Sequence, residues 1–538
     1  MHLDLHTAES DVTLTTEVCV VGCGVAGITT ARRLLELGRS VVLLESGGLD
    51  YEPATAALNA GDNIGEDYYA LEDARLRFFG GTTAIWGGRL AELDPIDLEA
   101  RPWVPHSGWP MAWAELSAWY APARARFGMP GTAAEAADLI AAGVRPPAFD
   151  PAALSLGVWT FDRKFNRFVF AECHDLIGHP RCRIVTHATV TEIGLDPDGR
   201  RVSRLSVRAL NGRALDVQAR TVVLAAGGLE NPRLLLASRS VMADGVGNGR
   251  DQVGRYFMEH PHARGGRVTG PAAFLLLDAF GRGRRLGELE LAGLIKPSAQ
   301  LQAERGILNT SLTIAARQPA QAAQNWGMAA YSSVKHTLAP TKQGRALWMA
   351  TKSAAKWAQR RTDPARPWLL HKLGLRDIAL LIRAEQAPNP ESRVLLTDRT
   401  DPLGVPRLAL DWRMTDLDVT SAAVLVETLG AELRRLGLGR VEPAEWLTEA
   451  GGGWRTDPLI SAHPIGGYHH MGTTRMSADP RSGVVDATGR IHGLENLYVV
   501  GSSVFPTSSW ANPTLTIAAL ALRTAEYAAE TAQAARAA

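Results

Sequence analysis

The sequence predicts an α/β protein in which a parallel sheet is assembled from separate segments and a second domain is inserted between them. Three observations support this fold class. The N-terminal stretch EVCVVGCGVAGITTARRLLELGRSVVLLES shows strand, helix and strand patterns in turn. Short apolar runs typical of buried parallel strands return at 221–225 and at 497–500. The 538 residues exceed what one hydrophobic core usually holds, so two or more domains are expected.

The turn between the first predicted strand and helix is rich in glycine. Gly22, Gly24 and Gly27 form the pattern G-x-G-x-x-G, and Glu45 stands at the end of the second strand. Glycines at this spacing let backbone N–H groups approach a pyrophosphate at the N-terminus of the helix, and the acidic residue accepts hydrogen bonds from a ribose. Because strand, turn, helix and second strand all occur in order, the motif strongly indicates a Rossmann-like dinucleotide-binding domain.

The predicted domains alternate along the chain. We expect the dinucleotide-binding domain to be built from residues 1–110, 166–265 and 455–538. Residues 111–165 are expected to form a helical segment of the substrate domain, and residues 266–454 its main part. This part is expected to contain a largely antiparallel sheet packed by helices, with strands at 392–396 and 407–410 and a helix at 416–436.

Composition excludes several classes of protein. The formal net charge is +1, which gives no indication of a nucleic-acid partner. The four cysteines fit neither a zinc pattern nor a disulfide framework, and no metal site is expected. No apolar run reaches the length of about 18 residues that indicates a transmembrane helix. A cytoplasmic location is the expectation, with export on a partner subunit left open.

Further motifs resemble those of one family throughout the chain. They are VVGCGVAG with Glu45, FGGTTAIWGG, VTHATVTEI, LAAGGLENPRLLLAS, YHHMGTTRM, GVVDATGRIHGLENLYVVGSSVFPT and SWANPTLTIAALALR. Together they resemble the glucose–methanol–choline (GMC) flavoprotein oxidoreductases. Within that family, the motif sequences are most similar to those of the sugar-oxidising branch, which includes pyranose 2-oxidase, fructose dehydrogenase and C-glycoside 3-oxidases.

The resemblance implies FAD as cofactor and oxidation of a CH–OH carbon by hydride transfer to flavin N5. The family's active-site histidine stands three residues before the Gly of a Gly-Thr pair, here Gly472-Thr473, which assigns the role of base to His469. Imidazole suits this role because its ordinary pKa lies near neutral pH. The second group that holds the substrate oxygen corresponds to Asn512, whose amide can donate to a developing alkoxide.

His470 and His463 are the other histidines of this stretch. In extended chain, neighbouring side chains point to opposite faces, so His470 is expected to turn away from the flavin if His469 faces it. A shift of register by one residue would exchange their roles, and this alternative stays open. His463 is expected to be structural, although it stands close enough in sequence to reach the pocket.

The resemblance also implies the cofactor contacts. The Asn512-Pro513-Thr514 helix start is expected to direct its dipole and the Thr514 N–H toward the flavin N1 and C2 carbonyl. Ile85 occupies the position where some relatives attach FAD through a histidine, so FAD is expected to be non-covalent. The expected contacts are Gly22, Gly24, Gly27, Glu45, Gly80, Gly81, Thr82, Thr83, Trp86, Val190, Ala226, Gly227, Gly501, Ser502, Asn512 and Thr514. Gly501 replaces an Asp of many members, which leaves backbone N–H groups to serve there.

The substrate is less readable than the cofactor. A sugar, glycoside or polyol is expected, with Glu385, Gln386 and Trp510 as candidate contacts, and oxygen or another redox partner as electron acceptor. A flavin-containing lyase of the hydroxynitrile lyase type stays open as an alternative, whereas a photodecarboxylase has no need of the histidine–asparagine pair. Residues 341–383 are basic and contain three tryptophans, a pattern typical of a solvated face, a partner contact or a membrane contact.

Overall fold

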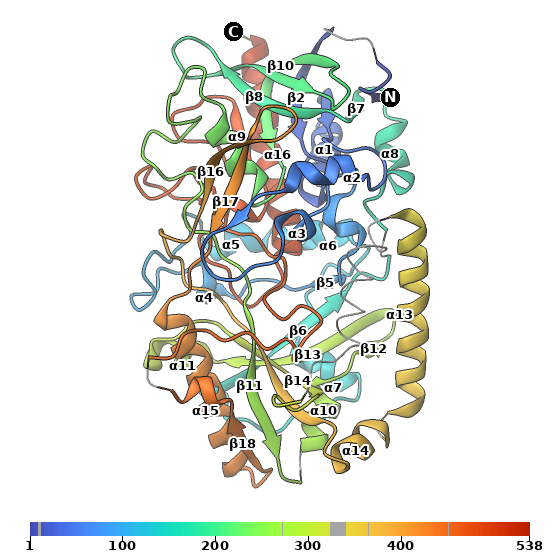
Figure 1. Cartoon of the computed structure of the whole chain (residues 1–538), viewed down its shortest axis with the longest axis vertical. Coiled ribbons are helices and arrows are strands. Elements are labelled where there is room, and N and C mark those ends of the chain that lie inside the picture. Colours follow the sequence, from blue (N-terminus) through green and yellow to red (C-terminus); the bar gives the residue numbers. More distant parts are fainter. Residues whose placement is uncertain are drawn as a thin grey trace.

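The computed structural model describes residues 1–8, 12–164, 166–271, 273–322, 341–363, 365–449 and 451–537. In these ranges the chain forms two large sheets and one small sheet. Figure 1 shows the molecule as an elongated body, with one large sheet and both chain termini at the top and the other large sheet at the bottom. The helix α16 descends from the C-terminus toward the middle of the molecule.

The first sheet contains the dinucleotide-binding motif. Its strands are, in spatial order, β1 (His2–Asp4), β7 (Cys182–Thr186), β3 (Val41–Leu44), β2 (Val12–Val21), β10 (Ala214–Leu224), β9 (Val202–Arg208) and β8 (Thr189–Leu195), with β19 (Leu497–Val499) also on β10. The strands β1, β7, β3, β2 and β10 pair in parallel, each with the next in this order, and β19 pairs in parallel with β10. The strands β9 and β8 pair antiparallel at one edge. The predicted α/β class is therefore confirmed.

The helices α1 (Val25–Glu36) and α16 (Thr514–Ala537) pack against this sheet and against each other. Their buried side chains belong to the same hydrophobic core as β2, β3 and β10. The buried face of α16 is mostly alanine, as at Ala518, Ala525 and Ala528. Because alanine side chains are small, α1 and α16 can approach each other closely.

The second sheet pairs antiparallel throughout its described strands. They are β18 (Arg440–Pro443), β11 (His262–Thr269), β15 (Asp377–Arg383), β14 (Ser311–Arg317), β13 (Leu289–Pro297), β6 (Leu154–Phe161) and β5 (Arg89–Leu90), with β12 (Arg284–Leu286) also on β13. The helices α7 (Ala136–Ala141), α10 (Ala273–Phe280) and α15 (Asp416–Arg435) bury their apolar faces on it. The expected antiparallel sheet packed by helices is confirmed.

The strands and the expected segments divide the chain differently. The strand β11 crosses the expected boundary at 265/266, and β6 pairs with β13 although it lies in the segment expected to be helical. The strands β16 (Arg393–Thr400) and β17 (Pro406–Asp411) form a small sheet with β4 (Asp62–Asn63) rather than joining the large one. Hydrophobic periodicity indicates a strand but carries no information about which partner it finds.

The remaining helices are short, apart from one long helix on the outside. They are α2 (Pro53–Ala56), α3 (Leu71–Ala74), α4 (Pro95–Leu98), α5 (Trp113–Ser117), α6 (Tyr120–Arg126), α8 (His174–Ile177), α9 (Glu230–Ala237), α11 (Ala299–Arg305), α13 (Lys342–Thr362) and α14 (Ala365–Lys372). The long helix α13 runs along the side of the molecule in Figure 1. Across the described ranges, no helix combines the length and the apolar content needed to cross a membrane.

Candidate active site

A cavity of about 380 Å³ lies where the two large sheets meet. Its wall includes the β2–α1 turn, the loop after α3, the strand ends at Arg89 and Arg383, and the start of α16. It brings together most residues predicted from the sequence: Gly22, Gly24, Glu45, Gly80, Gly81, Thr82, Thr83, Trp86, Val190, Ala226, Gly227, His463, His469, His470, Gly501, Ser502, Asn512 and Thr514. Segments far apart in sequence thus form one site.

The three motif glycines serve three different purposes. A Cβ on Gly22 would lie 2.7 Å from the Ala225 carbonyl oxygen, and Gly22 has a φ of +105°. A Cβ on Gly27 would lie 1.9 Å from the Gly22 carbonyl oxygen, so α1 packs tightly onto the strand. A Cβ on Gly24 would meet nothing within 4 Å and would occupy the cavity itself. Gly22 and Gly27 are therefore needed for packing, whereas Gly24 leaves room for a ligand.

Two more glycines leave the cavity open at its opposite wall. Gly227 and Gly501 have φ values of +89° and +119°, and a Cβ on either would meet nothing within 4 Å. The backbone at Gly501 is one that residues with a Cβ rarely adopt. An Asp at this position would be strained, which explains why Gly stands here. These open positions fit a bound dinucleotide such as FAD.

Glu45 is buried at the end of β3. Its carboxylate accepts hydrogen bonds from the Cys23 N–H at 3.0 Å and from the Gly47 N–H at 2.9 Å. Burial raises the pKa of Glu45, and these hydrogen bonds oppose part of the increase. The carboxylate lines the cavity and has further lone pairs, so it can accept hydrogen bonds from a ribose while it holds the glycine turn in place.

The loop at 80–86 forms a 3₁₀ turn over Gly81–Ala84. The Thr82 hydroxyl accepts a hydrogen bond from the Leu76 N–H at 3.1 Å, and the Thr83 hydroxyl donates to the Gly80 carbonyl at 2.6 Å. Both hydroxyls thus stabilise the turn as well as lining the cavity. Ile85 also lines it, and its side chain has no nucleophilic atom for a covalent link to a cofactor.

His469 and Asn512 meet at one wall of the cavity. The Asn512 Nδ2 atom lies 3.2 Å from the His469 Nε2 atom. Asn512 stands just before α16, which begins at Thr514, one residue later than its expected first turn at Pro513. The first N–H groups of a helix have no acceptor within the helix, so α16 directs free donors and the positive end of its dipole into the site.

The hydrogen-bond network fixes which nitrogen of His469 carries the proton. The His260 Nε2 atom lies 3.0 Å from the Ser508 carbonyl oxygen, which only accepts, so Nε2 is the protonated nitrogen of His260. The His260 Nδ1 atom therefore has a lone pair, and it lies 2.7 Å from the His469 Nδ1 atom. His469 donates from Nδ1, and its Nε2 lone pair points to Asn512 and the cavity.

His469 is held as a neutral base. Burial lowers its pKa well below the ordinary value, and the neighbouring His260, His262 and His470 lower it further. Burial likewise lowers the pKa of His260 to about 4. A neutral imidazole with an unprotonated Nε2 atom, which here accepts from the Asn512 amide, can accept a proton near pH 7.

His470 points to a different set of neighbours. Its Nε2 atom lies 3.0 Å from the Tyr68 hydroxyl, which donates to Glu259 Oε2 at 2.5 Å. The Glu259 carboxylate also accepts the His469 backbone N–H at 2.9 Å and the Gly467 N–H at 3.1 Å. Burial raises the pKa of Glu259 against these hydrogen bonds. This network holds the main chain that carries both histidines.

Three residues expected at the substrate lie outside the cavity wall. The Glu385 carboxylate is buried and binds Arg101 at 2.5 Å. The Gln386 side chain accepts a hydrogen bond from the Glu259 N–H at 2.9 Å. The Trp510 indole N–H donates to Asp94 Oδ2 at 2.8 Å. Each is satisfied by the protein itself, so the structure does not bring them to the substrate side.

Sequence reasoning missed other residues near the site. His260, Tyr68 and Glu259 contact the histidine pair, and Arg89 and Arg383 line the cavity beside it. The stretch MEHPH around His260 carries a signal, since adjacent acidic and imidazole groups at a strand start are unusual in a core. The arginines carry no such signal, because Arg is common throughout this chain.

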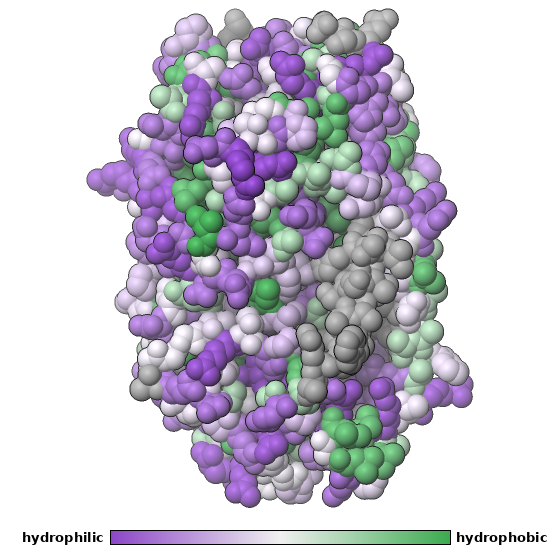
Figure 2. Space-filling model, viewed as in Figure 1, coloured by the Kyte–Doolittle hydropathy of each residue, from purple (hydrophilic) through white to green (hydrophobic). Residues whose placement is uncertain are grey.

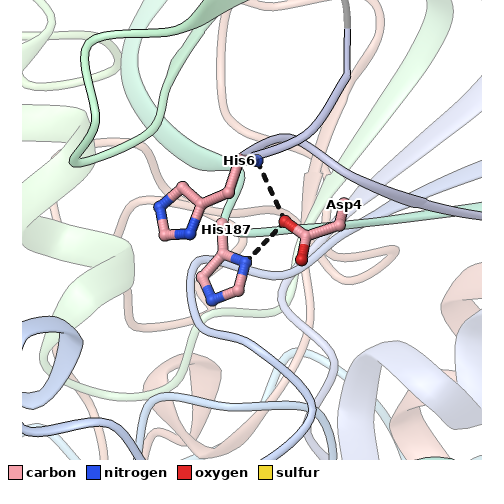
Figure 3. A group of neighbouring side chains, drawn as sticks. All are labelled: Asp4, His6 and His187. Carbon is pink, nitrogen blue, oxygen red and sulfur yellow. Dashed lines mark hydrogen bonds and ion pairs between the residues drawn. The ribbon is translucent and has the colours of Figure 1, made fainter.

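A separate group of polar side chains lies at the edge of the first sheet (Figure 3). The His187 Nδ1 atom lies 2.7 Å from Asp4 Oδ1, and its Nε2 atom lies 2.9 Å from Glu52 Oε2. The rings of His6 and His187 stack with centroids 3.8 Å apart. Both nitrogens of His187 are engaged by carboxylates, so this group clasps the N-terminal strand to the sheet.

The basic segment presents an apolar surface. Trp348 is buried, whereas Trp357 and Trp368 are 62% and 50% exposed. Figure 2 shows a hydrophobic patch at the lower right, where α14 lies in Figure 1. The exposed large apolar residues there are Trp368, Leu369, Leu373 and Leu375. These four residues lie close together in sequence, whereas exposed apolar residues on ordinary protein surfaces are scattered singly.

Two family models match the chain. Residues 17–243 match the FAD dependent oxidoreductases, and residues 388–521 match the GMC oxidoreductases. The glycine turn and Glu45 fall within the first match, and His469 and Asn512 fall within the second. The chain therefore contains an FAD-dependent oxidoreductase domain and a GMC oxidoreductase C-terminal domain.

Known relatives and a solved structure align with nearly the whole chain. Paromamine 6'-oxidase from Streptomyces fradiae is 26% identical, over 95% of this chain and 91% of the relative. The fructose dehydrogenase large subunit from Gluconobacter japonicus is 22% identical, over 96% of this chain and 98% of the relative. The crystal structure of pyridoxine 4-oxidase from Mesorbium loti superposes with a TM-score of 0.54 at 18% identity, over 95% of this chain and 99% of that one, and shows the same fold.

Proposed function

We propose that the protein oxidises the CH–OH group of a sugar, glycoside or polyol to a carbonyl, with His469 as the base. The observation that carries this proposal is the pair formed by His469 Nε2 and Asn512 Nδ2, 3.2 Å apart on the wall of the cavity. By their names, two relatives oxidise paromamine and fructose, which supports this substrate class. FAD, when bound, supplies the acceptor for the hydride at its N5 atom.

The chain's own residues manage the proton and the oxygen. An alcohol releases hydride readily only when its O–H proton leaves, and the lone pair of His469 Nε2 is placed to take that proton. The Asn512 amide donates to the oxygen as it gains negative charge, without adding a charge of its own. Held by both groups, the alcohol would direct its C–H bond toward one face of the cavity.

The start of α16 presents free N–H donors to the cavity close to Asn512. Thr514 is the first residue of α16 and lines the cavity. Its N–H lies in the first turn, where free donors and the helix dipole favour an anion. We propose that the Thr514 N–H and this helix start would hold the flavin and stabilise negative charge on it when FAD is bound. We also propose that the FAD is non-covalent because Ile85 offers no attachment atom.

One experiment separates oxidation from lyase chemistry, which other flavoproteins carry out with a histidine base. The purified holoenzyme is mixed without oxygen with sugars, glycosides and polyols, and with a cyanohydrin. An oxidoreductase loses the visible absorbance of oxidised flavin with its alcohol substrate. Cleavage of the cyanohydrin with the flavin still oxidised, and no bleaching by any alcohol, would reject the proposal in favour of a lyase.

The electron acceptor and the location complete the proposal. We propose oxygen or another redox partner as acceptor, and the exposed basic and apolar face of α13 and α14 as a contact surface for a partner or membrane. Co-sedimentation with anionic vesicles tests membrane contact. Comparing the turnover rate with a protein electron acceptor to the rate with a small dye acceptor tests contact with a protein partner. Both are compared with the double variant Trp357→Ser/Trp368→Ser.

The four cysteines are free and buried, which supports a cytoplasmic location.

A further inference from the structure

Two guanidinium groups lie on the wall of the cavity that holds His469 and Asn512. Arg89 belongs to β5, Arg383 ends β15, and both line this cavity. They flank the indole of Trp159, whose ring centroid lies 5.2 Å from the Arg89 Cζ atom and 5.6 Å from the Arg383 Cζ atom. An aromatic face attracts a cation, but it does not neutralise one.

The charges of both arginines are uncompensated within the described residues. No carboxylate there lies within 4.0 Å of either guanidinium, and the buried Nε atom of the Arg89 side chain has no hydrogen-bond partner. The Arg383 Nη1 atom donates to His262 Nε2 at 2.9 Å. That imidazole is neutral, because its Nδ1 donates to the His463 carbonyl at 2.6 Å and burial lowers its pKa. The segment 323–340 contains neither Asp nor Glu in its sequence.

Two other arginines, Arg101 and Arg233, are buried and are paired with carboxylates. Arg101 binds Glu385 at 2.5 Å, and Arg233 binds Asp401 at 2.7 Å. Enclosing a charge without an opposite charge beside it costs free energy of folding. Two arginines without carboxylate partners on the wall of one cavity therefore indicate a ligand that supplies negative charge. Burial lowers the pKa of both Arg89 and Arg383, as expected for cations that lack a partner.

We propose that the cavity takes a hydroxylated substrate that carries an anionic group, a carboxylate or a phosphate, bound by Arg89 and Arg383. This inference rests on the proposed oxidation and names its substrate class. The planar fork of a guanidinium suits either anion, and binding there leaves the anionic group unchanged while the CH–OH carbon reacts near His469. The hydride passes to FAD and the hydroxyl proton to His469, so the product is a carbonyl compound that keeps its anion.

The test compares neutral and anionic sugars of similar size. Flavin reduction in the holoenzyme is measured without oxygen for glucose, glucuronate and glucose 6-phosphate. We expect the second-order rate for at least one anionic sugar to exceed that for glucose at least about tenfold, because a charged hydrogen bond is worth more than a neutral one. The sugar that gains identifies the anion as a carboxylate or a phosphate. An equal or greater rate for glucose would overturn the inference.

Variants assign the preference to the two arginines. Arg89→Gln removes a guanidinium whose buried Nε atom has no hydrogen-bond partner in the described ranges, so it disturbs folding least, and Arg383→Gln is the second variant. The matched control is Arg317→Gln, since Arg317 is likewise half-buried, has no carboxylate within 4.0 Å among the described residues and lies outside the cavity wall. We expect the anionic-to-neutral ratio to fall toward one in the first two variants and to persist in the control. A ratio that is unchanged in Arg89→Gln and Arg383→Gln would contradict the proposal.

A binding measurement distinguishes this inference from the oxidation itself. The holoenzyme is titrated calorimetrically with inorganic phosphate and with acetate, which cannot be oxidised at a CH–OH group. Binding that is lost in Arg89→Gln and kept in Arg317→Gln supports the inference even if no alcohol reduces the flavin, which would reject only the proposed oxidation. Flavin reduction by neutral sugars, with no arginine-dependent anion binding, would support the oxidation and overturn the inference.

Discussion

The Nδ1 atoms of His260 and His469 lie 2.7 Å apart, and His260 is in turn bound through Nε2 to the Ser508 carbonyl. These two hydrogen bonds set the tautomer of His469, so that its Nε2 atom is a base rather than a donor. His260 is thus a positioning residue, because it acts on the reaction only through His469. The relationship links a strand start of the antiparallel sheet to the C-terminal segment that carries the site.

The role of His260 predicts a graded loss of activity. His260→Leu removes the acceptor for the His469 Nδ1–H, whereas His260→Asn keeps an oxygen acceptor near the same position. We expect His260→Leu to slow flavin reduction at least about tenfold, because a misplaced proton disables a general base, and His260→Asn to recover part of the rate. The pH profile of flavin reduction should shift in His260→Leu alone. Equal losses in the two variants, with an unchanged profile, would mean that His260 only fills space.

The motif glycines predict separate effects on cofactor and fold. Gly24→Val places a side chain in open cavity, so we expect the protein to fold with unchanged thermal stability as apoprotein and to retain much less FAD. Gly27→Ala places a Cβ 1.9 Å from a carbonyl oxygen, so we expect a lower melting temperature without added ligand. Absorbance of bound flavin and apoprotein unfolding curves measure the two effects. Normal FAD content in Gly24→Val would contradict the assigned pyrophosphate position.

The buried pair of Arg101 and Glu385 predicts a loss of stability. Glu385→Ala leaves the Arg101 guanidinium buried without its partner, which typically costs about 3–5 kcal/mol. Chemical unfolding of the apoprotein measures this cost, with the exposed pair Arg163–Glu288 as a control that should change stability little. A stable Glu385→Ala protein with a raised KM alone would restore the substrate role expected from the sequence.

His187 predicts a pH-dependent contribution to stability. Burial lowers its pKa, but hydrogen bonds and charges from Asp4 and Glu52 raise it more, so the net pKa is raised. A raised folded pKa gives stability that is complete below the unfolded value of about 6.5 and is lost as the pH rises through the folded value. The difference in melting temperature between the protein and His187→Gln should therefore shrink from pH about 6 to about 8.5. A constant difference would show that His187 stays neutral.

The sequence predicted the cofactor site better than the substrate site, for a physical reason. The glycine turn and Glu45 act through local backbone geometry, which a short motif specifies completely. His469 and Asn512 follow from motifs whose spacing within each segment is local too. In contrast, Arg89 and Arg383 reach the cavity, and His260 reaches His469, only because β5, β11 and β15 belong to one sheet. Strand partners are not encoded in periodicity.

The same limit explains the misplaced substrate residues. Glu385 and Gln386 follow directly after β15, where polar side chains beside a site were expected. Arg383, two residues earlier, lines the cavity, whereas Glu385 turns into the protein toward Arg101. The sequence places both residues next to the cavity, but the direction of each side chain depends on the partner that it finds in the fold.

The most direct test of the proposed chemistry compares the two adjacent histidines in one assay. Flavin reduction is followed without oxygen in a stopped-flow instrument for His469→Ala and His470→Ala, each checked for bound FAD. We predict that His469→Ala retains FAD and loses about 100-fold or more of the rate, as expected for removal of a general base. His470→Ala should lose far less. A fully active His469→Ala enzyme, or the reverse order of losses, would contradict the assignment of His469 as the base.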